Sequence, residues 1–315
     1  MATPAKLEAL LEKISDLDPD TRKILDAEGL GKKPSREEIM KAVWKHRPDL
    51  ADLKTPPRKG KLTGPAMDDA VEIFEAVLKG GRKNILALID MLREVDDGRD
   101  YRARYVLHAL VTYCCRPDKG EQRDMIIAAL CSQLGGKRPK SIQAFLLQQL
   151  QLCADGRIAS DVGKLLGDEQ LGDAAAATLL AVGAVDPLRA ALPRMKGRAK
   201  LAVLQNLAVA GDPVSAGAMT DALRDSDSDV RLAAAAGLAR IGKASAVGPL
   251  TQAADAEGTW ERIKMAQACL VLAEKLLAAD RKSDAKKLYT YLRDTRAAKG
   301  ERHVRDLAAN ALATM

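Results

Sequence analysis

Residues 228–242 read SDVRLAAAAGLARIG, an alanine-rich pattern that recurs along most of the chain. When the recurrences are aligned, each places a leucine in the same column, at intervals of 28 to 42 residues. A small or aliphatic residue precedes every column leucine by four positions, which is the spacing of one helix face. The seven segments are 102–114, 141–153, 171–183, 198–211, 228–242, 262–274 and 304–315, and their column leucines are Leu110, Leu150, Leu179, Leu207, Leu238, Leu270 and Leu312.

Shorter apolar segments alternate with these helices, so the repeating unit is helix, turn, helix, turn. Prolines at 187 and 213 fit the first position of a helix, and Gly211 and Gly242 fit its end, where glycine adopts a left-handed conformation easily. Alanine combines high helix propensity with a small side chain, which lets neighbouring helices approach closely. The sequence therefore predicts an all-α protein, an α-α superhelix of about seven helical pairs.

Residues 222–250, ALRDSDSDVRLAAAAGLARIGKASAVGPL, resemble a bacterial HEAT repeat of the type also seen in phycobilin-lyase-related proteins, and 304–312 matches its second helix. The other units match only in apolar spacing. The resemblance implies an armadillo-like α-solenoid over roughly Ala66 to Met315. It also implies that Asp229, Arg231 and Arg305 tie successive repeats together and have a structural role. A repeat fold of this kind indicates architecture and says little about function.

The sequence predicts three regions. Residues 1–53 lack the repeat period and form an N-terminal helical element with helical patterns at 7–14, 20–30 and 36–46, the last capped by Ser35. Residues 54–65, KTPPRKGKLTGP, form a basic linker rich in proline and glycine. Residues 66–315 form the HEAT-like repeat solenoid.

Composition limits the class and the compartment. The chain has 315 residues, 50 Lys+Arg against 43 Asp+Glu, and only 3% aromatic residues, which disfavours β-sandwiches and barrels. Acidic residues interrupt the start where a secretion signal would need an apolar core, and no uncharged stretch is long enough to span a membrane. Five cysteines without a Cys-x-x-Cys pair predict reduced, buried thiols. We therefore expect a cytoplasmic protein that does not contact a membrane.

The sequence offers little catalytic chemistry. Its three histidines, His46, His108 and His303, lie in different regions without metal-ligand spacing. It contains no Gly-x-Ser-x-Gly elbow and no phosphate-binding glycine loop. We therefore predict no catalytic residue, no metal and no cofactor, and hence a protein that is not an enzyme.

One cluster of charge points to a partner. Between Pro187 and Gly211 the chain has five basic residues and no acid. On the inner curve of a superhelix these side chains would hold phosphates or an acidic peptide, whereas on a rim they would only be solvated. The candidate partner-binding residues are Arg189, Arg194, Lys196, Arg198 and Lys200.

These features favour a non-enzymatic protein–protein interaction scaffold or adaptor that binds a protein or an extended peptide in the groove of the solenoid. The alternative is a HEAT-like protein that binds nucleic acid through phosphates. Because bacterial DNA glycosylases share a HEAT-like fold, a glycosylase relation belongs to that alternative. It requires aromatic side chains in the groove, and the candidates that we weigh are Trp44, Trp260 and the tyrosines of the first unit, a pattern that does not match. A chromophore-lyase role rests on the repeat subtype alone.

Overall fold

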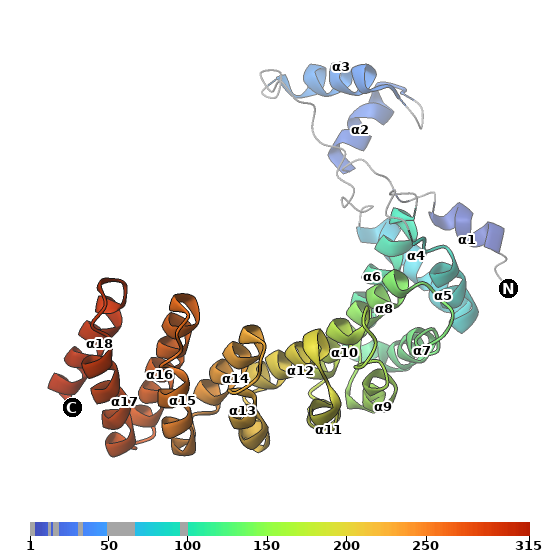
Figure 1. Ribbon diagram of the computed structural model, residues 1–315. Coiled ribbons are helices and arrows are strands. Elements are labelled where there is room, and N and C mark those ends of the chain that lie inside the picture. The colour runs from blue at the N-terminus through green and yellow to red at the C-terminus, as the bar shows by residue number, and fades with distance from the viewer. Residues whose placement is uncertain (1–3, 12–13, 15–18, 31–33, 49–66, 95–99) are drawn as a thin grey trace. The chain divides into compact units, whose positions relative to one another are not determined.

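The computed structural model describes all residues except 1–3, 12–13, 15–18, 31–33, 49–66 and 95–99 (Figure 1). The described residues form α-helices and short 3-10 helices and contain no strand. The predicted all-α fold of stacked helical pairs is therefore confirmed. The chain forms two compact units, Met1–Gln133 and Leu134–Met315.

The first unit begins with three short helices, two of which have a small core of their own. Leu25 of α2 packs with Ile39 and Val43 of α3 in this core. Ser35 caps α3, because its hydroxyl accepts from the backbone N–H of Glu38 while the Glu38 carboxylate accepts from that of Ser35. The helices of this unit are α1 (Pro4–Leu11), α2 (Pro19–Ala27), α3 (Arg36–His46), α4 (Met67–Lys79), α5 (Gly81–Asp90), α6 (Tyr101–Tyr113), the 3-10 turn η2 (Pro117–Lys119) and α7 (Gly120–Cys131).

The predicted linker at 54–65 lies outside the described residues, so the division of the chain at that segment stays a prediction. The helix α1 contacts α4, α5 and α6, and the Nε of Arg102 in α6 donates to the carbonyl of Ile14 at 3.1 Å. Part of the N-terminal element therefore packs directly on the helices that follow the linker.

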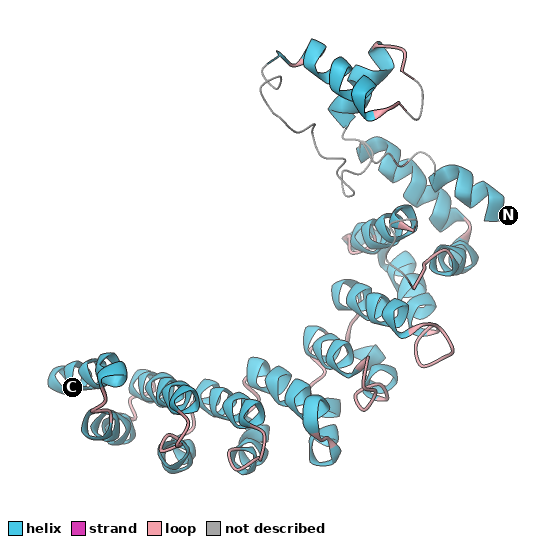
Figure 2. Cartoon of the chain, turned by 45° about the horizontal axis from the view of Figure 1, so that its top comes forward, coloured by secondary structure: helices cyan, strands magenta, loops and turns pink. Residues whose placement is uncertain are grey.

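The second unit contains a regular array of helices in two rows (Figure 2). We call α8, α10, α12, α14, α16 and α18 the inner row, because the unit curves toward it, and α9, α11, α13, α15 and α17 the outer row. The inner helices are α8 (Lys140–Cys153), α10 (Gly172–Ala181), α12 (Gly197–Ala210), α14 (Ser228–Ile241), α16 (Thr259–Ala278) and α18 (Arg302–Thr314). The outer helices are α9 (Ala159–Gly163), α11 (Asp186–Ala191), α13 (Ala216–Ala222), α15 (Val247–Ala253) and α17 (Lys282–Thr295), with 3-10 turns η3 (Gly156–Ile158), η4 (Leu192–Arg194), η5 (Pro213–Ser215), η6 (Ala244–Ala246) and η7 (Lys299–Glu301).

Helix ends in this unit follow the sequence closely. Gly211 and Gly242 take φ of 62° and 77° and end α12 and α14, as predicted. Asp212 caps η5, with its carboxylate accepting from the backbone N–H of Ser215 at 3.1 Å and Pro213 at the first position. Local backbone and side-chain chemistry therefore sets these helix ends.

The core of the repeats lies along two columns of the sequence alignment. The position four residues before the column leucine is buried in all seven segments. The leucine itself is buried in the first five but only half-buried at Leu270 and Leu312, so the predicted column is wrong for the last two. In α16 the inward positions are taken by Cys269 and Leu272 instead. In α18, Leu312 lies in the last turn of the helix, two residues before Thr314.

Candidate functional site: a groove on the inner row

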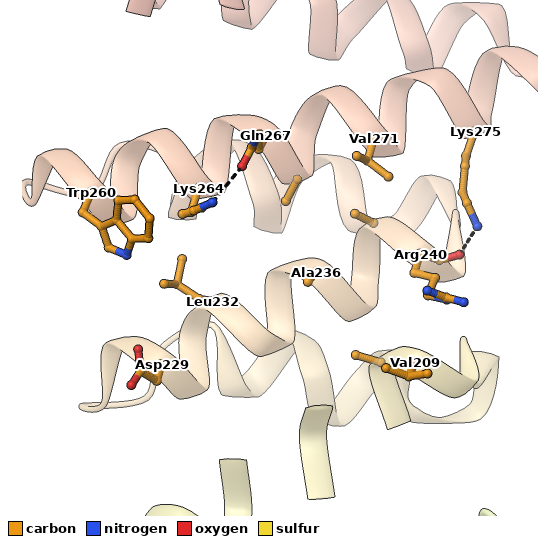
Figure 3. Close-up of a pocket in the computed structure, with 13 residues that line it drawn as sticks. Val209, Asp229, Leu232, Ala236, Arg240, Trp260, Lys264, Gln267, Val271 and Lys275 are labelled. Atoms are coloured by element: carbon orange, nitrogen blue, oxygen red, sulfur yellow. Dashed lines mark hydrogen bonds between the residues drawn. The ribbon is translucent and has the colours of Figure 1, made fainter. Parts of the chain in front are cut away.

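A groove with a volume of about 860 Å³ crosses three neighbouring helices of the inner row. The long sides of the groove come from α14 and α16, and α12 contributes Ala208 and Val209 at one edge (Figure 3). Trp260 and Asp229 lie at the end formed by the first turns of α16 and α14. Arg240 and Lys275 lie at the other end, in the last turns of the same helices.

The groove combines small side chains with unusually exposed apolar ones. Ala236 and Ala268 line it with single methyl groups, which leave space for another chain to approach. Beside them, the exposed fraction is 52% for Val209, 66% for Trp260 and 43% for Val271. A contiguous exposed apolar patch on a folded domain marks an interaction surface more often than scattered single residues do.

Most of the large hydrophobic residues that are exposed in the described part of the chain lie on the inner row. Of the seven large hydrophobic residues that are exposed in that part of the chain, five belong to helices of this row. Val214, at 70% exposed, lies in η5 on the other side of the repeat, and Met315 is the last residue. The five are Leu152, Val209, Trp260, Val271 and Leu307.

Basic side chains flank the apolar part of the groove. The ammonium of Lys264 lies 4.7 Å from the ring centroid of Trp260 and donates to Gln267 at 3.4 Å. At the other end, Lys275 donates to the backbone carbonyl of Arg240, in the last turn of α14. Three cations and the single carboxylate of Asp229 therefore line the groove.

Ion pairs between successive repeats hold the walls of the groove in place. The Arg231 guanidinium in α14 binds the Glu261 carboxylate of α16 through two contacts, Nε to Oε1 at 2.5 Å and Nη2 to Oε2 at 2.6 Å. This hydrogen bonding lowers the pKa of Glu261 below its usual value. The Nη1 of the same guanidinium donates to the carbonyl of Asp225 at 2.6 Å. Because both side chains are largely buried, the bidentate pair fixes α14 against α16.

The same kind of contact recurs along the array. A basic residue of one inner helix pairs with an acid that belongs to an adjacent repeat, and the contacts have similar sequence separations. Lys200 binds Asp225 just before α14, which gives that carboxyl a lowered pKa. The full set of pairs is Lys140–Asp168, Arg198–Asp173, Lys200–Asp225, Arg231–Glu261 and Arg262–Glu301.

The basic cluster predicted from the sequence is divided by the structure. Arg189 in α11 lies 2.6 Å from Asp186 and 3.0 Å from Asp212, and Arg198 and Lys200 take part in the pairs just described. Arg194 donates to the carbonyl of Ala190 at 3.4 Å, and Lys196 is exposed immediately before α12. None of the five lines the groove. Their proposed role in partner binding stays a prediction.

The three residues expected to tie repeats together have different surroundings. Arg231 makes the contacts to α16 described above. Asp229 is exposed and lines the groove, and Arg305 contacts Asp306 of its own helix at 3.3 Å. The structural role inferred for these three residues therefore has direct contacts to support it only at Arg231.

Other expectations concern thiols, metals and membranes. Cys114, Cys153 and Cys269 are buried, and burial raises the pKa of the Cys269 thiol to about 12. Cys115 is exposed, so the expectation of burial is wrong there, because it follows the last turn of α6 on the solvent side. Within the described ranges, no group of three metal-binding side chains comes together. No described helix combines the length and apolarity needed to cross a membrane.

Sequence reasoning weighed Trp260 only as a stacking residue and did not identify Val209 or Val271. Both valines lie two positions from a buried position of the repeat pattern, Leu207 and Cys269 respectively. An apolar residue at this offset falls on a helix flank, away from the core-facing stripe. That offset, in the two units on either side of α14, is the signal that could have located the groove.

Comparison with known proteins agrees with this geometry. Residues 185–271 match the family model for HEAT repeats, a segment that includes most of the groove. Over this segment the helical array is therefore a HEAT-like solenoid. No curated protein shows significant similarity to the chain.

Solved structures with some likeness include two crystal structures of engineered proteins from the Northeast Structural Genomics Consortium. The first is 17% identical, with a TM-score of 0.43, and the match covers 99% of this chain and 95% of that chain. The second is also 17% identical, with a TM-score of 0.22 and coverage of 86% and 96%.

Proposed function

We propose that this protein is a non-enzymatic interaction scaffold of the cytoplasm, and that the groove over α12, α14 and α16 binds a polypeptide segment of a partner protein. The observation that carries the proposal is that three exposed apolar side chains, Val209, Trp260 and Val271, line one groove together with small alanines. Burying such side chains against a partner removes apolar surface from water, and an aromatic anchor contributes strongly to binding.

The ion pairs between repeats support the same function. Because Arg231 and Glu261 hold α14 and α16 together, the groove is formed before a ligand arrives. A preformed site avoids the entropic cost of ordering its own walls on binding. HEAT-like arrays generally bind other proteins along such surfaces. The proposal also includes a bacterial origin and the phycobilin-lyase-related subtype of HEAT repeat. It does not extend to a lyase activity.

A displayed library of random peptides tests the proposal. We expect peptides selected on the wild-type protein to lose at least about tenfold in affinity, or ~1.4 kcal/mol, on Val271→Asp. Val214→Asp is the matched control, since it places the same charge on an exposed valine outside the groove. Both variants should keep the wild-type helical circular dichroism. Selection of no peptide, or of peptides that bind Val271→Asp as well as Val214→Asp, would overturn the proposal.

Nucleic-acid binding is a second candidate, because Trp260 stacks with Lys264 at one end of a groove that also carries Arg240 and Lys275. Bases stack on exposed aromatic rings, and cations contact phosphates. Fluorescence anisotropy with labelled duplex and single strands would show binding that survives about 150 mM salt. That binding should fall when Arg194, Lys196, Arg198 and Lys200 are replaced by Gln if the basic cluster contributes. The apolar lining and the carboxylate partners of Arg198 and Lys200 favour the polypeptide.

A further inference from the structure

Resting on the proposed function, we infer that the segment bound in the groove is an amphipathic helix whose flanking charges are acidic. Three features of the groove carry this inference: its length, the size of its lining side chains, and the placement of its cations.

The length of the groove suits a helix of several turns. Trp260 and Lys275 mark its two ends along α16, and fifteen residue steps separate them. At ~1.5 Å per residue this distance is about 22 Å, or roughly four helical turns. Asp229 and Arg240 mark the corresponding ends along α14, which has the same chain direction in the array. These two residues are eleven steps apart, or about 16 Å at ~1.5 Å per residue, so a ligand helix lying between α14 and α16 would contact both walls over about three of its turns.

The groove is lined by both small and large side chains, as packing against a helix requires. Ala236 on α14 and Ala268 on α16 line the groove, and in the sequence each lies between the residues that mark the two ends of its wall, so a ligand backbone can approach closely there. Leu232, Val209 and Val271 line the same groove with larger side chains. A ligand with apolar residues at i, i+3 or i+4, and i+7 would place a large side chain over each small one.

Charge selects the polar face of that helix. Lys264 is fixed near one end by the ring of Trp260 and by Gln267. Lys275 and Arg240 lie near the other end. Lys264 and Lys275 are eleven residues apart, or about three turns, so acidic residues at a similar separation on the ligand would reach both. A lysine ammonium has three donors, so Lys275 retains donors after its bond to the Arg240 carbonyl.

The charge of the protein itself disfavours a second copy of this chain as the occupant. Its formal net charge is +7, so two copies repel each other at low ionic strength. A foreign acidic helix meets the opposite field, which speeds its association and strengthens its binding.

Three displayed libraries test the inference on the full-length protein. Each presents peptides of about 18 residues with the same randomised apolar face at helical spacing, and the remaining positions are fixed as Glu, Lys or Gln. We expect enrichment from the Glu library alone. Enrichment from the Lys or Gln library, or of an oligonucleotide over every peptide in a competition assay, would overturn the inference.

A synthetic peptide from the Glu library then tests the site and the conformation. Lys264→Gln with Lys275→Gln should weaken its binding at least about fivefold, and Lys282→Gln, an exposed lysine of α17, should not. A proline at the centre of the peptide should weaken binding by about tenfold or more, because it interrupts the helix. Equal binding of the proline peptide, or by the double lysine variant, would contradict the inference.

These outcomes separate the inference from the proposed function. If random peptides bind in a manner that depends on Val271 but are neutral, basic or extended, the scaffold function stands and the acidic helix is wrong. If no peptide from any library depends on Val271, both are wrong.

Discussion

A buried charge network at the C-terminal end of the array leads to a prediction about stability. The Arg296 side chain is fully buried, and its Nη2 donates to the Ala254 carbonyl at 2.7 Å and to the Tyr291 hydroxyl at 2.5 Å. Its Nε and Nη1 have no hydrogen-bond partner among the described residues. The nearest carboxylates, Glu301 and Asp255, each lie 3.6 Å away, and Glu301 is only 5% exposed.

The perturbation is Glu301→Leu, and Arg296→Met is its partner in a double-mutant cycle. Glu301 also accepts from Nε of Arg262 at 2.7 Å, so its removal leaves one buried guanidinium and one half-buried one without their shared carboxylate. Breaking a buried pair in this way costs about 3–5 kcal/mol. Arg296→Met removes the buried charge and its unsatisfied donors, and its main loss is the bond to Ala254, about 1–3 kcal/mol.

The free energy of unfolding of the double variant should therefore exceed, by at least ~2 kcal/mol, the value expected from adding the losses of the two single variants. The reason is that methionine at position 296 leaves no buried charge for Glu301 to compensate. Far-ultraviolet circular dichroism during urea unfolding would measure the four proteins. Since a repeat array can unfold locally, hydrogen exchange of amides in α17 and α18 should show the same order. Asp306→Asn, in the exposed pair with Arg302, is the control and should change stability little.

Two results would refute this reasoning. One is a loss below about 1 kcal/mol for Glu301→Leu, which would mean that water solvates Arg296 despite its burial. The other is additivity of the two substitutions within ~0.5 kcal/mol, which would mean that the carboxylate and the guanidinium do not interact.

Three further predictions concern the core, acid stability and thiol chemistry. Leu238→Asp should abolish the cooperative thermal transition followed by circular dichroism, because it buries an unpaired charge at a position only 2% exposed. The hydrogen bond from Arg262 holds the pKa of Glu301 below its ordinary value of 4.5. The ionised Glu301 carboxylate therefore contributes its full stabilisation above pH 4.5, and this stabilisation is lost as pH falls through the lower pKa of the folded state. Urea unfolding at a series of pH values should show a shallower loss of stability in acid for Glu301→Leu than for wild type. A thiol reagent at pH 8, followed by peptide mapping, should label Cys115 well before Cys269, whose pKa burial raises to about 12.

The architecture of the repeats could be predicted from the sequence because each helix carries its own information. The predicted segment 141–153 corresponds to α8 at Lys140–Cys153, and 228–242 to α14 at Ser228–Ile241. The helix ends followed from glycines and from the Asp212–Pro213 pair, which act through local backbone geometry. Alignment was less informative at the end of the array, where Leu270 and Leu312 are half-buried and the packing depends on which neighbours are present.

The candidate site was much less predictable. The acid-free cluster at 189–200 looked like a binding surface in the sequence, but three of its five cations pair with acids outside the cluster, and most of these acids lie more than 20 residues away along the chain. Asp173, for example, is 25 residues before Arg198, and Asp225 is 25 residues after Lys200. The net charge of the 189–200 segment therefore overestimated the number of cations that have no acidic partner in the folded protein. The apolar residues of the groove, in contrast, come from separate repeats, and none of them is unusual within its own segment.

Stacking and binding depend on the same small residues in this array. On the core side of α14, Ala234 is buried and allows the neighbouring helices to approach, while two residues further on Ala236 lines the open groove. A larger side chain at Ala234 would push repeats apart, whereas one at Ala236 would fill the groove and leave the stack intact. Ala234→Leu should therefore reduce both stability and peptide binding, and Ala236→Leu binding alone. Because both positions lie on α14, comparing the two variants separates an effect on the binding surface from an effect on the stack of helices. If Ala236→Leu lost stability but still bound the peptide as wild type does, the groove would not be the docking site.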